Sequence, residues 1–156
     1  MENTGFAETM AGISRTHYCG ELRPAHIGQE VTVCGWVQRQ RDLGQLIFID
    51  LRDRTGIVQL AFDDESKTDL FEKAFTARSE FVLAAKGLVR ERASKNMEIP
   101  TGEIEIEVSE LRVLARSETP PFAIEEDSNV NMATRLKYRY LDLRRPDMQR
   151  ILMARH

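Results

Sequence analysis

Apolar and polar residues alternate in five segments of the chain, and this pattern predicts five β-strands. The segments are residues 31–41, 46–52, 57–62, 81–92 and 103–108. Side chains of a strand point alternately to its two faces, so an apolar residue at every second position gives each strand one face for a core. Gly35 lies inside the first segment, where a glycine indicates a sharp bend or a close approach of another backbone.

The alternation also predicts which residues line the core. The inward positions are Val31, Val33, Gly35, Val37, Ile47, Ile49, Leu51, Val58, Leu60, Phe62, Phe81, Leu83, Ala85, Gly87, Val89, Ile104, Ile106 and Val108. Residues 53–56 (DRTG) separate the second and third segments and carry turn chemistry with a glycine at the last position. These two strands should therefore form an antiparallel hairpin.

Residues 67–77 change to helical spacing, between the third and fourth strands. Their apolar stripe consists of Leu70, Phe71, Ala74 and Phe75. Thr68 or Asp69 has the side-chain oxygen expected of an N-cap. The order of three strands, one helix and two strands predicts an all-β fold with one helix, namely a five-stranded OB-fold, which is a Greek-key barrel.

The pattern breaks after the fifth strand. Residues 116–134 are polar and acidic and contain Pro120-Pro121, which disfavours helix and central strand, so we interpret them as a hinge. Short helices are expected beyond it, with Pro146 at the first position of one of them. The sequence predicts an N-terminal extension (1–14), the OB-fold (15–115), the hinge (116–134) and the start of a second domain (135–156). Disorder is one interpretation of the extension.

Composition narrows the class of protein. The 156 residues are 42% hydrophobic and 30% charged, which is typical of a folded globular chain. The formal net charge of −3 excludes a uniformly basic nucleic-acid coat but allows a local basic site. No apolar run reaches the ~18–20 residues of a membrane span. Residues 1–14 lack the pattern of a secretory signal. We therefore expect a cytoplasmic protein without a membrane partner.

The two cysteines do not indicate a metal site. Cys19 and Cys34 stand fifteen positions apart, without a CxxC pair or a Cys/His ligand spacing. We interpret them as reduced, buried thiols of a cytosolic protein.

Two outward-facing side chains of the predicted hairpin have the chemistry of base recognition. Phe48 lies among polar neighbours on the second strand, where an exposed ring would stack one base. Gln59 on the third strand should lie across the hairpin and close to Phe48, and its amide offers donors and an acceptor to a base edge. The alternatives are a ring covered by a loop or a neighbouring domain, and an ordinary outward glutamine.

Arginines surround this pair on the neighbouring strands. Arg41 closes the first strand, while Arg90 and Arg92 lie on the outward side of the fourth, with Asn96 in the loop that follows. A guanidinium suits such a place because it grips phosphate or a base edge and also stacks. Glu105 faces outward on the fifth strand, where it would accept from a base amino group, or alternatively keep other strands from a solvated edge.

The charge of the first three strands favours the reading of a short loop. Residues 31–62 hold four arginines and three aspartates, a net of 4 − 3 = +1. So small an excess suits unspecific coating of a single strand poorly and recognition of a few splayed bases better. The chain shows no catalytic pattern, since its three histidines stand at no diagnostic spacing from a nucleophile and no glycine-rich phosphate loop occurs.

Four stretches together resemble the start of a bacterial-type aspartyl-tRNA synthetase. They are RTHYCGEL (15–22), VTVCGWVQRQRDLGQLIFIDLRDRTGIVQL (31–60), TGEIEIEV (101–108) and RLKYRYLDLRRPDM (135–148). The resemblance implies an N-terminal OB-fold that binds the anticodon loop of tRNA. In the full-length enzyme it implies a cytoplasmic homodimer, a class II ligase that attaches aspartate with ATP and Mg²⁺. Residues 135–156 would begin a truncated catalytic domain, so we expect this chain alone to be inactive.

The resemblance also implies roles for single residues. Phe48 would stack the central anticodon base, and Arg41 and Gln59 would read it. Glu105 would accept from the first base, of guanine type. The third base and nearby phosphates would be served by Arg90, Arg92 and Asn96.

Leu43 carries an expectation about specificity. Leucine at this position resembles enzymes restricted to the aspartate tRNA, whereas histidine resembles those that also charge the asparagine tRNA. The alternatives to this family are an asparaginyl- or lysyl-tRNA synthetase domain of the same fold and a general single-stranded nucleic-acid-binding or protein-binding OB domain.

Overall fold

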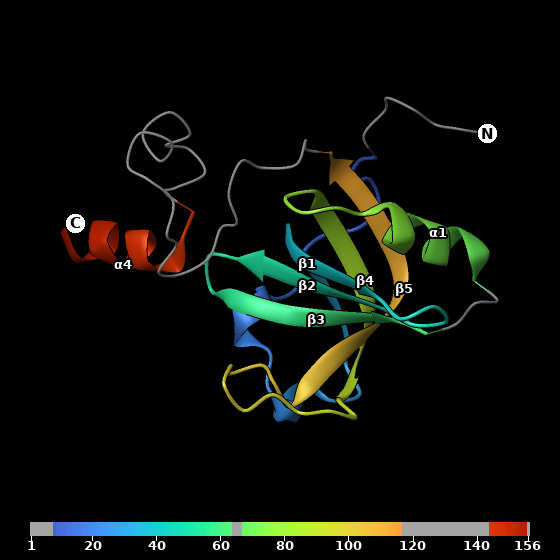
Figure 1. Cartoon of the computed structure of the whole chain (residues 1–156), viewed down its shortest axis with the longest axis horizontal. Helices are drawn as coiled ribbons and strands as arrows, with labels where there is room; N and C mark the ends of the chain where they lie inside the picture. Colours follow the sequence, from blue (N-terminus) through green and yellow to red (C-terminus); the bar gives the residue numbers. More distant parts are fainter. Residues whose placement is uncertain (1–7, 64–66, 117–143, 156) are drawn as a thin grey trace. The chain divides into compact units, whose positions relative to one another are not determined.

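The computed structural model describes residues 8–63, 67–116 and 144–155. Five strands close into a barrel in the order β1-β2-β3-β5-β4 (Figure 1). The strands are β1 (Glu30–Asp42), β2 (Ile47–Asp53), β3 (Gly56–Phe62), β4 (Val82–Glu91) and β5 (Ile104–Ala115). Two 3₁₀ turns, η1 (Cys19–Glu21) and η2 (Pro24–His26), precede β1. The predicted all-β barrel with a helix between its third and fourth strands is confirmed.

The core follows the predicted alternation. All apolar positions expected to point inward are buried, from Val31 in β1 to Val108 in β5. The β2–β3 hairpin forms as expected, because Asp53 pairs with Gly56 and leaves two residues for the turn. There the Thr55 amide donates to Asp53 Oδ1 at 2.8 Å, and Gly56 has a φ of 147°, which favours glycine.

A β-bulge changes the phase of β1. Its register with β2 shifts between Val37 and Arg39, so that Gln38 is an extra residue. Beyond it, Arg39 and Arg41 turn to the outer face, which explains why the alternation ends at Val37. The close approach predicted at Gly35 is confirmed, because a Cβ there would lie 2.3 Å from the Arg52 carbonyl oxygen.

β5 continues seven residues beyond its predicted end at 108. A register shift against β4 leaves Ser109 as an extra residue, and the buried positions change from Ile106 and Val108 to Leu111 and Val113. The bulge interrupts the period of two, and the alternation therefore ends early in the sequence although the strand does not.

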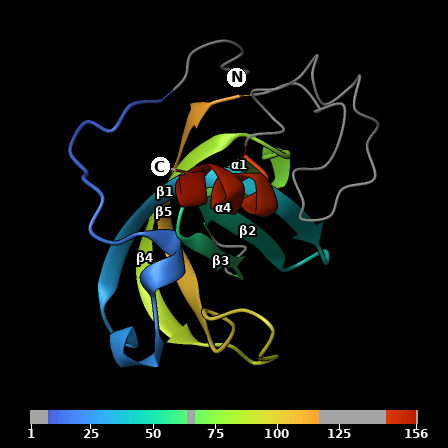
Figure 2. The same ribbon diagram turned by 90° about the vertical axis from the view of Figure 1, so that its left-hand side faces the viewer.

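Helix α1 (Thr68–Thr76) lies at one end of the barrel, and the loop between β4 and β5 lies at the other (Figures 1 and 2). Two details predicted for α1 were wrong. Phe75 is exposed, because only Leu70, Phe71 and Ala74 pack on the core. Neither Thr68 nor Asp69 caps the helix, since the N-cap position falls on Lys67, which makes no side-chain capping bond.

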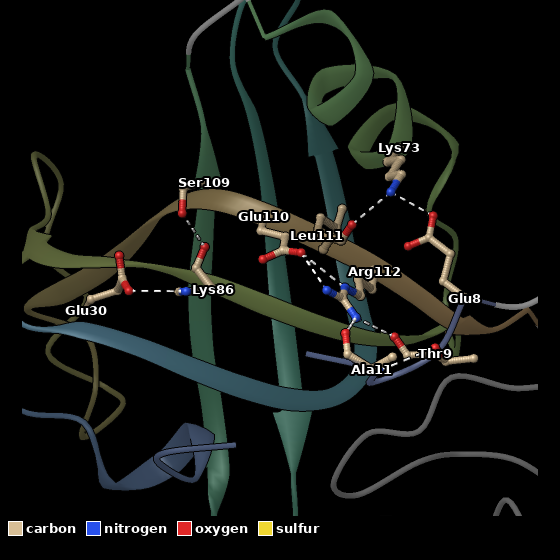
Figure 3. Close-up of polar contacts among 10 residues, drawn as sticks. All are labelled: Glu8, Thr9, Ala11, Glu30, Lys73, Lys86, Ser109, Glu110, Leu111 and Arg112. Carbon is tan, nitrogen blue, oxygen red and sulfur yellow. Dashed lines mark hydrogen bonds and ion pairs between the residues drawn. The ribbon is translucent and has the colours of Figure 1, made fainter. Parts of the chain in front are cut away.

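Residues 8–11 lie along β5 (Figure 3). The Glu8 amide donates to the Val113 carbonyl at 2.9 Å, and the Glu8 carboxylate pairs with Lys73 of α1 at 2.7 Å. Arg112 donates to the carbonyls of Thr9 and Ala11. Part of the predicted extension therefore belongs with the barrel.

The chain divides into two compact units, Met1–Glu118 and Thr119–His156. In the second unit the structure describes α4 (Pro146–Arg155), whose first residue is the predicted Pro146. The predicted hinge, apart from Arg116, lies outside the described residues, as do residues 135–143, where the short helices were expected to begin. Neither α1 nor α4, the two α-helices of the described part, is long and apolar enough to cross a bilayer.

Candidate nucleic-acid interface

The strand register brings most of the predicted site residues to one outer surface of the barrel. Arg41 of β1 is the cross-strand partner of Phe48 in β2. Gln59 in β3 lies opposite Asp50 of β2, and Arg90 in β4 lies opposite Glu105 of β5. Because β3 also pairs with β5 beside these positions, the side chains meet across five strands.

A chain of hydrogen bonds joins four of these residues. Arg41 Nη2 donates to Gln59 Oε1 at 2.7 Å, and Gln59 Nε2 donates to Glu105 Oε1 at 3.0 Å. Arg90 Nε donates to the other oxygen of Glu105 at 2.8 Å. We call these four residues the recognition network. Arg41 and Arg90 donate at its two ends, while Gln59 both accepts and donates and Glu105 accepts between them.

The middle of the recognition network is more buried than the sequence indicates. Gln59 and Glu105 face outward as predicted, yet they are only 4% and 5% exposed. Arg41 and Arg90 are each about one-third exposed at their side chains. The guanidinium groups are therefore the more accessible part of the network, and the middle pair that bonds to them is largely covered.

Phe48 lies beside the network and is half-buried. The Arg41 guanidinium carbon stands 5.2 Å from the centroid of its ring, within the range of a cation–π contact. This contact orients both groups. A base that stacks on Phe48 would consequently lie within reach of the Arg41 donors.

Asp50 is a member of this surface that sequence reasoning missed as a functional residue. Its Oδ1 lies 3.7 Å from Arg41 Nη2, and its side chain is 26% exposed. Burial raises the pKa of Asp50 above its usual range, against the opposite influence of Arg41, Arg92 and Arg39. Its shared parity with Phe48 was the only signal of its place in the sequence.

Arg90 has further acidic partners. Its Nη2 lies 2.7 Å from Asp63, the residue directly after β3, and its Nη1 lies 3.4 Å from Glu107. Asp63 was not predicted, since nothing in the sequence shows that the end of β3 comes close to β4.

The remaining predicted residues lie around this surface. Arg92 is partly buried, and its Nε has no hydrogen-bond partner among the described residues. The Asn96 side chain accepts the Glu98 amide at 3.0 Å within the β4–β5 loop. Leu43 is exposed in the β1–β2 loop. In the described part of the chain, neither Asn96 nor Leu43 bonds to the recognition network, and their roles stay predictions.

Arg52, which the alternation of β2 places on the same side as Phe48 and Asp50, is sealed from solvent. Its Nη2 pairs with Glu80 at 2.8 Å, and its Nη1 donates to Gln38 Oε1 at 2.5 Å. The Arg52 and Glu80 side chains are 7% and 4% exposed. Glu80 has a φ of 68°, an uncommon conformation for a residue with a side chain. This cluster is separate from the recognition network.

The two thiols are free. Cys19 is buried and Cys34 partly so, and burial raises the pKa of both groups. A thiol with a raised pKa is a poor nucleophile because the thiolate is the reactive form. Within residues 8–63, 67–116 and 144–155, no three His, Cys, Asp or Glu side chains gather as metal ligands would.

Comparison with known proteins finds relatives among the aspartate–tRNA ligases. An aspartate–tRNA ligase of Ruminiclostridium cellulolyticum is 60% identical over 96% of this chain and 25% of its own length. An aspartate–tRNA(Asp/Asn) ligase of Thermoanaerobacter pseudethanolicus is 57% identical over 95% of this chain and 25% of its own length. This chain therefore spans about a quarter of the length of these curated relatives. The resemblance to aspartyl-tRNA synthetases is confirmed.

A solved structure shares the fold. The asparaginyl-tRNA synthetase of Pyrococcus horikoshii, in complex with asparaginyl-adenylate, is 31% identical with a TM-score of 0.67, over 86% of this chain and 30% of that one. The model of the OB-fold nucleic acid binding domain family matches residues 31–114, which is more than half of the chain. This match covers all five strands, and the chain belongs to the OB-fold nucleic acid binding domain family.

Proposed function

We propose that this chain binds the anticodon loop of a tRNA as part of an aspartate–tRNA ligase. The observation that carries the proposal is the recognition network next to Phe48. It sets a stacking ring, guanidinium donors and buried acceptors side by side on the outer surface of an OB-fold. The relatives that are more than 50% identical and named as aspartate–tRNA ligases support it.

The role proposed for each side chain is the one that the resemblance implies. The central anticodon base stacks on Phe48, where Arg41 and Gln59 read its edge. The first base donates to Glu105. Arg90 serves the third base and its phosphates, and Arg92 and Asn96 complete that contact. Because Glu105 already accepts from Gln59 and Arg90, the base takes a place that the network has shaped in advance.

The longer protein would carry the chemistry. In this proposal it attaches aspartate to tRNA in the cytoplasm as a homodimer, using ATP and Mg²⁺, and this chain alone is inactive. We assign neither ATP nor Mg²⁺ to any described residue. Leu43 restricts the enzyme to the aspartate tRNA, a point on which the names of the relatives differ.

Binding of anticodon stem-loops to the 156-residue chain tests the proposal. The aspartate stem-loop should bind best, and exchange of any one anticodon base should weaken binding at least about fivefold, since a good base contact is worth ~1–3 kcal/mol. Equal binding of all sequences would instead indicate a general single-strand-binding OB domain. Preference for an asparagine or lysine stem-loop would assign the chain to one of those synthetases.

A further inference from the structure

The surface around the recognition network is balanced in charge. Four arginines and four carboxylates lie there, so the formal charge of this surface is 4 − 4 = 0. They are Arg39, Arg41, Arg90, Arg92, Asp50, Asp63, Glu105 and Glu107. A surface that attracted RNA through its phosphates alone would carry an excess of positive charge.

The carboxylates are placed against the guanidinium groups. Arg90 contacts Asp63 and Glu105 at 2.7 Å each and Glu107 at 3.4 Å. Arg41 has Asp50 at 3.7 Å in addition to its bond to Gln59. A phosphate that approaches either arginine must therefore displace a carboxylate or lie next to it.

A base edge meets a different situation. Its N–H groups donate to carboxylates and its carbonyl and ring-nitrogen atoms accept from guanidinium groups, so a correct base uses both charges. A phosphate has acceptors only and is repelled by each carboxylate. The same acidic residues thus oppose backbone binding and allow base binding, which is discrimination by a repulsive element.

Among the four carboxylates, Asp50 and Asp63 suit this role in particular. Glu105 already belongs to the recognition network, and Glu107 is the most distant partner of Arg90. Asp63 is a close partner of Arg90, and its side chain is 36% exposed. Asp50 lies in the middle of the surface, between Arg39 and Gln59 in the strand register. Burial disfavours the ionised form of Asp50 and raises its pKa, against the opposite influence of Arg41.

We infer that Asp50 and Asp63 are specificity determinants that compete with RNA phosphates for Arg41 and Arg90. The inference rests on the proposed function. It adds that the arginines bind an RNA well only when base contacts replace the carboxylates, so unrelated RNA is released.

The test uses Asp50→Asn and Asp63→Asn, each in the 156-residue chain. The probes are an oligoadenylate and the aspartate anticodon stem-loop, titrated over a range of salt concentrations. Each substitution should raise the affinity for oligoadenylate about fivefold at ~0.1 M salt. It should also steepen the salt dependence by ~0.7, because one more phosphate is then neutralised on a single strand. The ratio of stem-loop to oligoadenylate affinity should fall accordingly.

Glu110→Gln is the matched control. Glu110 is a carboxylate, 40% exposed at its side chain, that pairs with Arg112 at 2.8 Å, on the part of β5 where residues 8–11 lie (Figure 3). The Glu110→Gln substitution removes the same charge as Asp50→Asn or Asp63→Asn. A general effect of net charge would therefore appear in this variant as well. The control should leave both affinities and the salt dependence unchanged.

The outcomes separate the two levels of the argument. If the wild type does not prefer the aspartate stem-loop, the proposed function fails. If the wild type prefers it but both aspartate variants keep the wild-type affinity for oligoadenylate and the same salt dependence, only the inference is overturned. Because Asp63 is exposed, Asp63→Asn keeps the test valid even if Asp50→Asn unfolds.

Discussion

Two arginine clusters on the same barrel have opposite relations to solvent. Arg52 and Glu80 form a sealed pair, with both side chains less than a tenth exposed. Arg90 pairs with Glu105 over a similar distance but remains about one-third exposed. The comparison teaches that the same type of ion pair is a structural contact when both partners are buried and leaves a guanidinium accessible when one partner is exposed.

The sealed pair should have the largest effect on stability. Glu80→Gln leaves the buried charge of Arg52 without its counter-ion, and loss of one partner of such a pair costs about 3–5 kcal/mol. Urea denaturation of the variant measures this loss. Asp63→Asn, which opens the exposed pair with Arg90, should cost at most ~1 kcal/mol in the same experiment. Equal losses in both variants would refute the distinction between the clusters.

Substitutions on the exposed surface that holds Arg90 and Phe48 should instead change the affinity for RNA. Phe48→Ala removes the stacking ring and should weaken the binding of the aspartate stem-loop by ~1–3 kcal/mol. Calorimetric titration gives the affinity, and the melting temperature serves as control. The melting temperature should change little because the ring lies outside the barrel core. A collapse of the melting temperature without a specific loss of binding would mean that Phe48 is structural.

The smallest expected effect concerns pH. The raised pKa of Asp50 means that the folded state binds a proton at this group more readily than the unfolded state. Its contribution to stability is therefore fully present below the unfolded pKa and is lost as the pH rises through the folded pKa. Relative to Asp50→Asn, the wild type should gain stability as the pH falls from 7 towards 4. Urea midpoints of both proteins at several pH values test this sign, and a relative loss for the wild type would contradict it.

The core could be predicted from the sequence because its only requirement is an apolar side chain at every second position. Val33, Ile49 and Leu60 meet that requirement in three different strands, and all are fully buried. The prediction failed where a bulge changes the phase, as at Ser109, since an extra residue leaves no mark in the sequence.

The candidate site could be predicted only in part. Phe48, Gln59 and Glu105 were found from parity alone, and the structure brings Gln59 and Glu105 into one network beside Phe48. Asp63 was missed because its contact with Arg90 depends on the closure of the barrel. Likewise, the burial of Arg52 requires Glu80, which lies 28 positions further along the chain.

Gln38 connects these two kinds of surface. As the extra residue of β1 it turns Arg41 toward Phe48, and its side chain accepts from the sealed Arg52. Val31, Val33 and Val37 of the first half thus point to the core, while in the second half Arg39 and Arg41 face outward and Gln40 bonds to α1. One extra residue thus lets the two halves of a single strand follow opposite phases of the alternation.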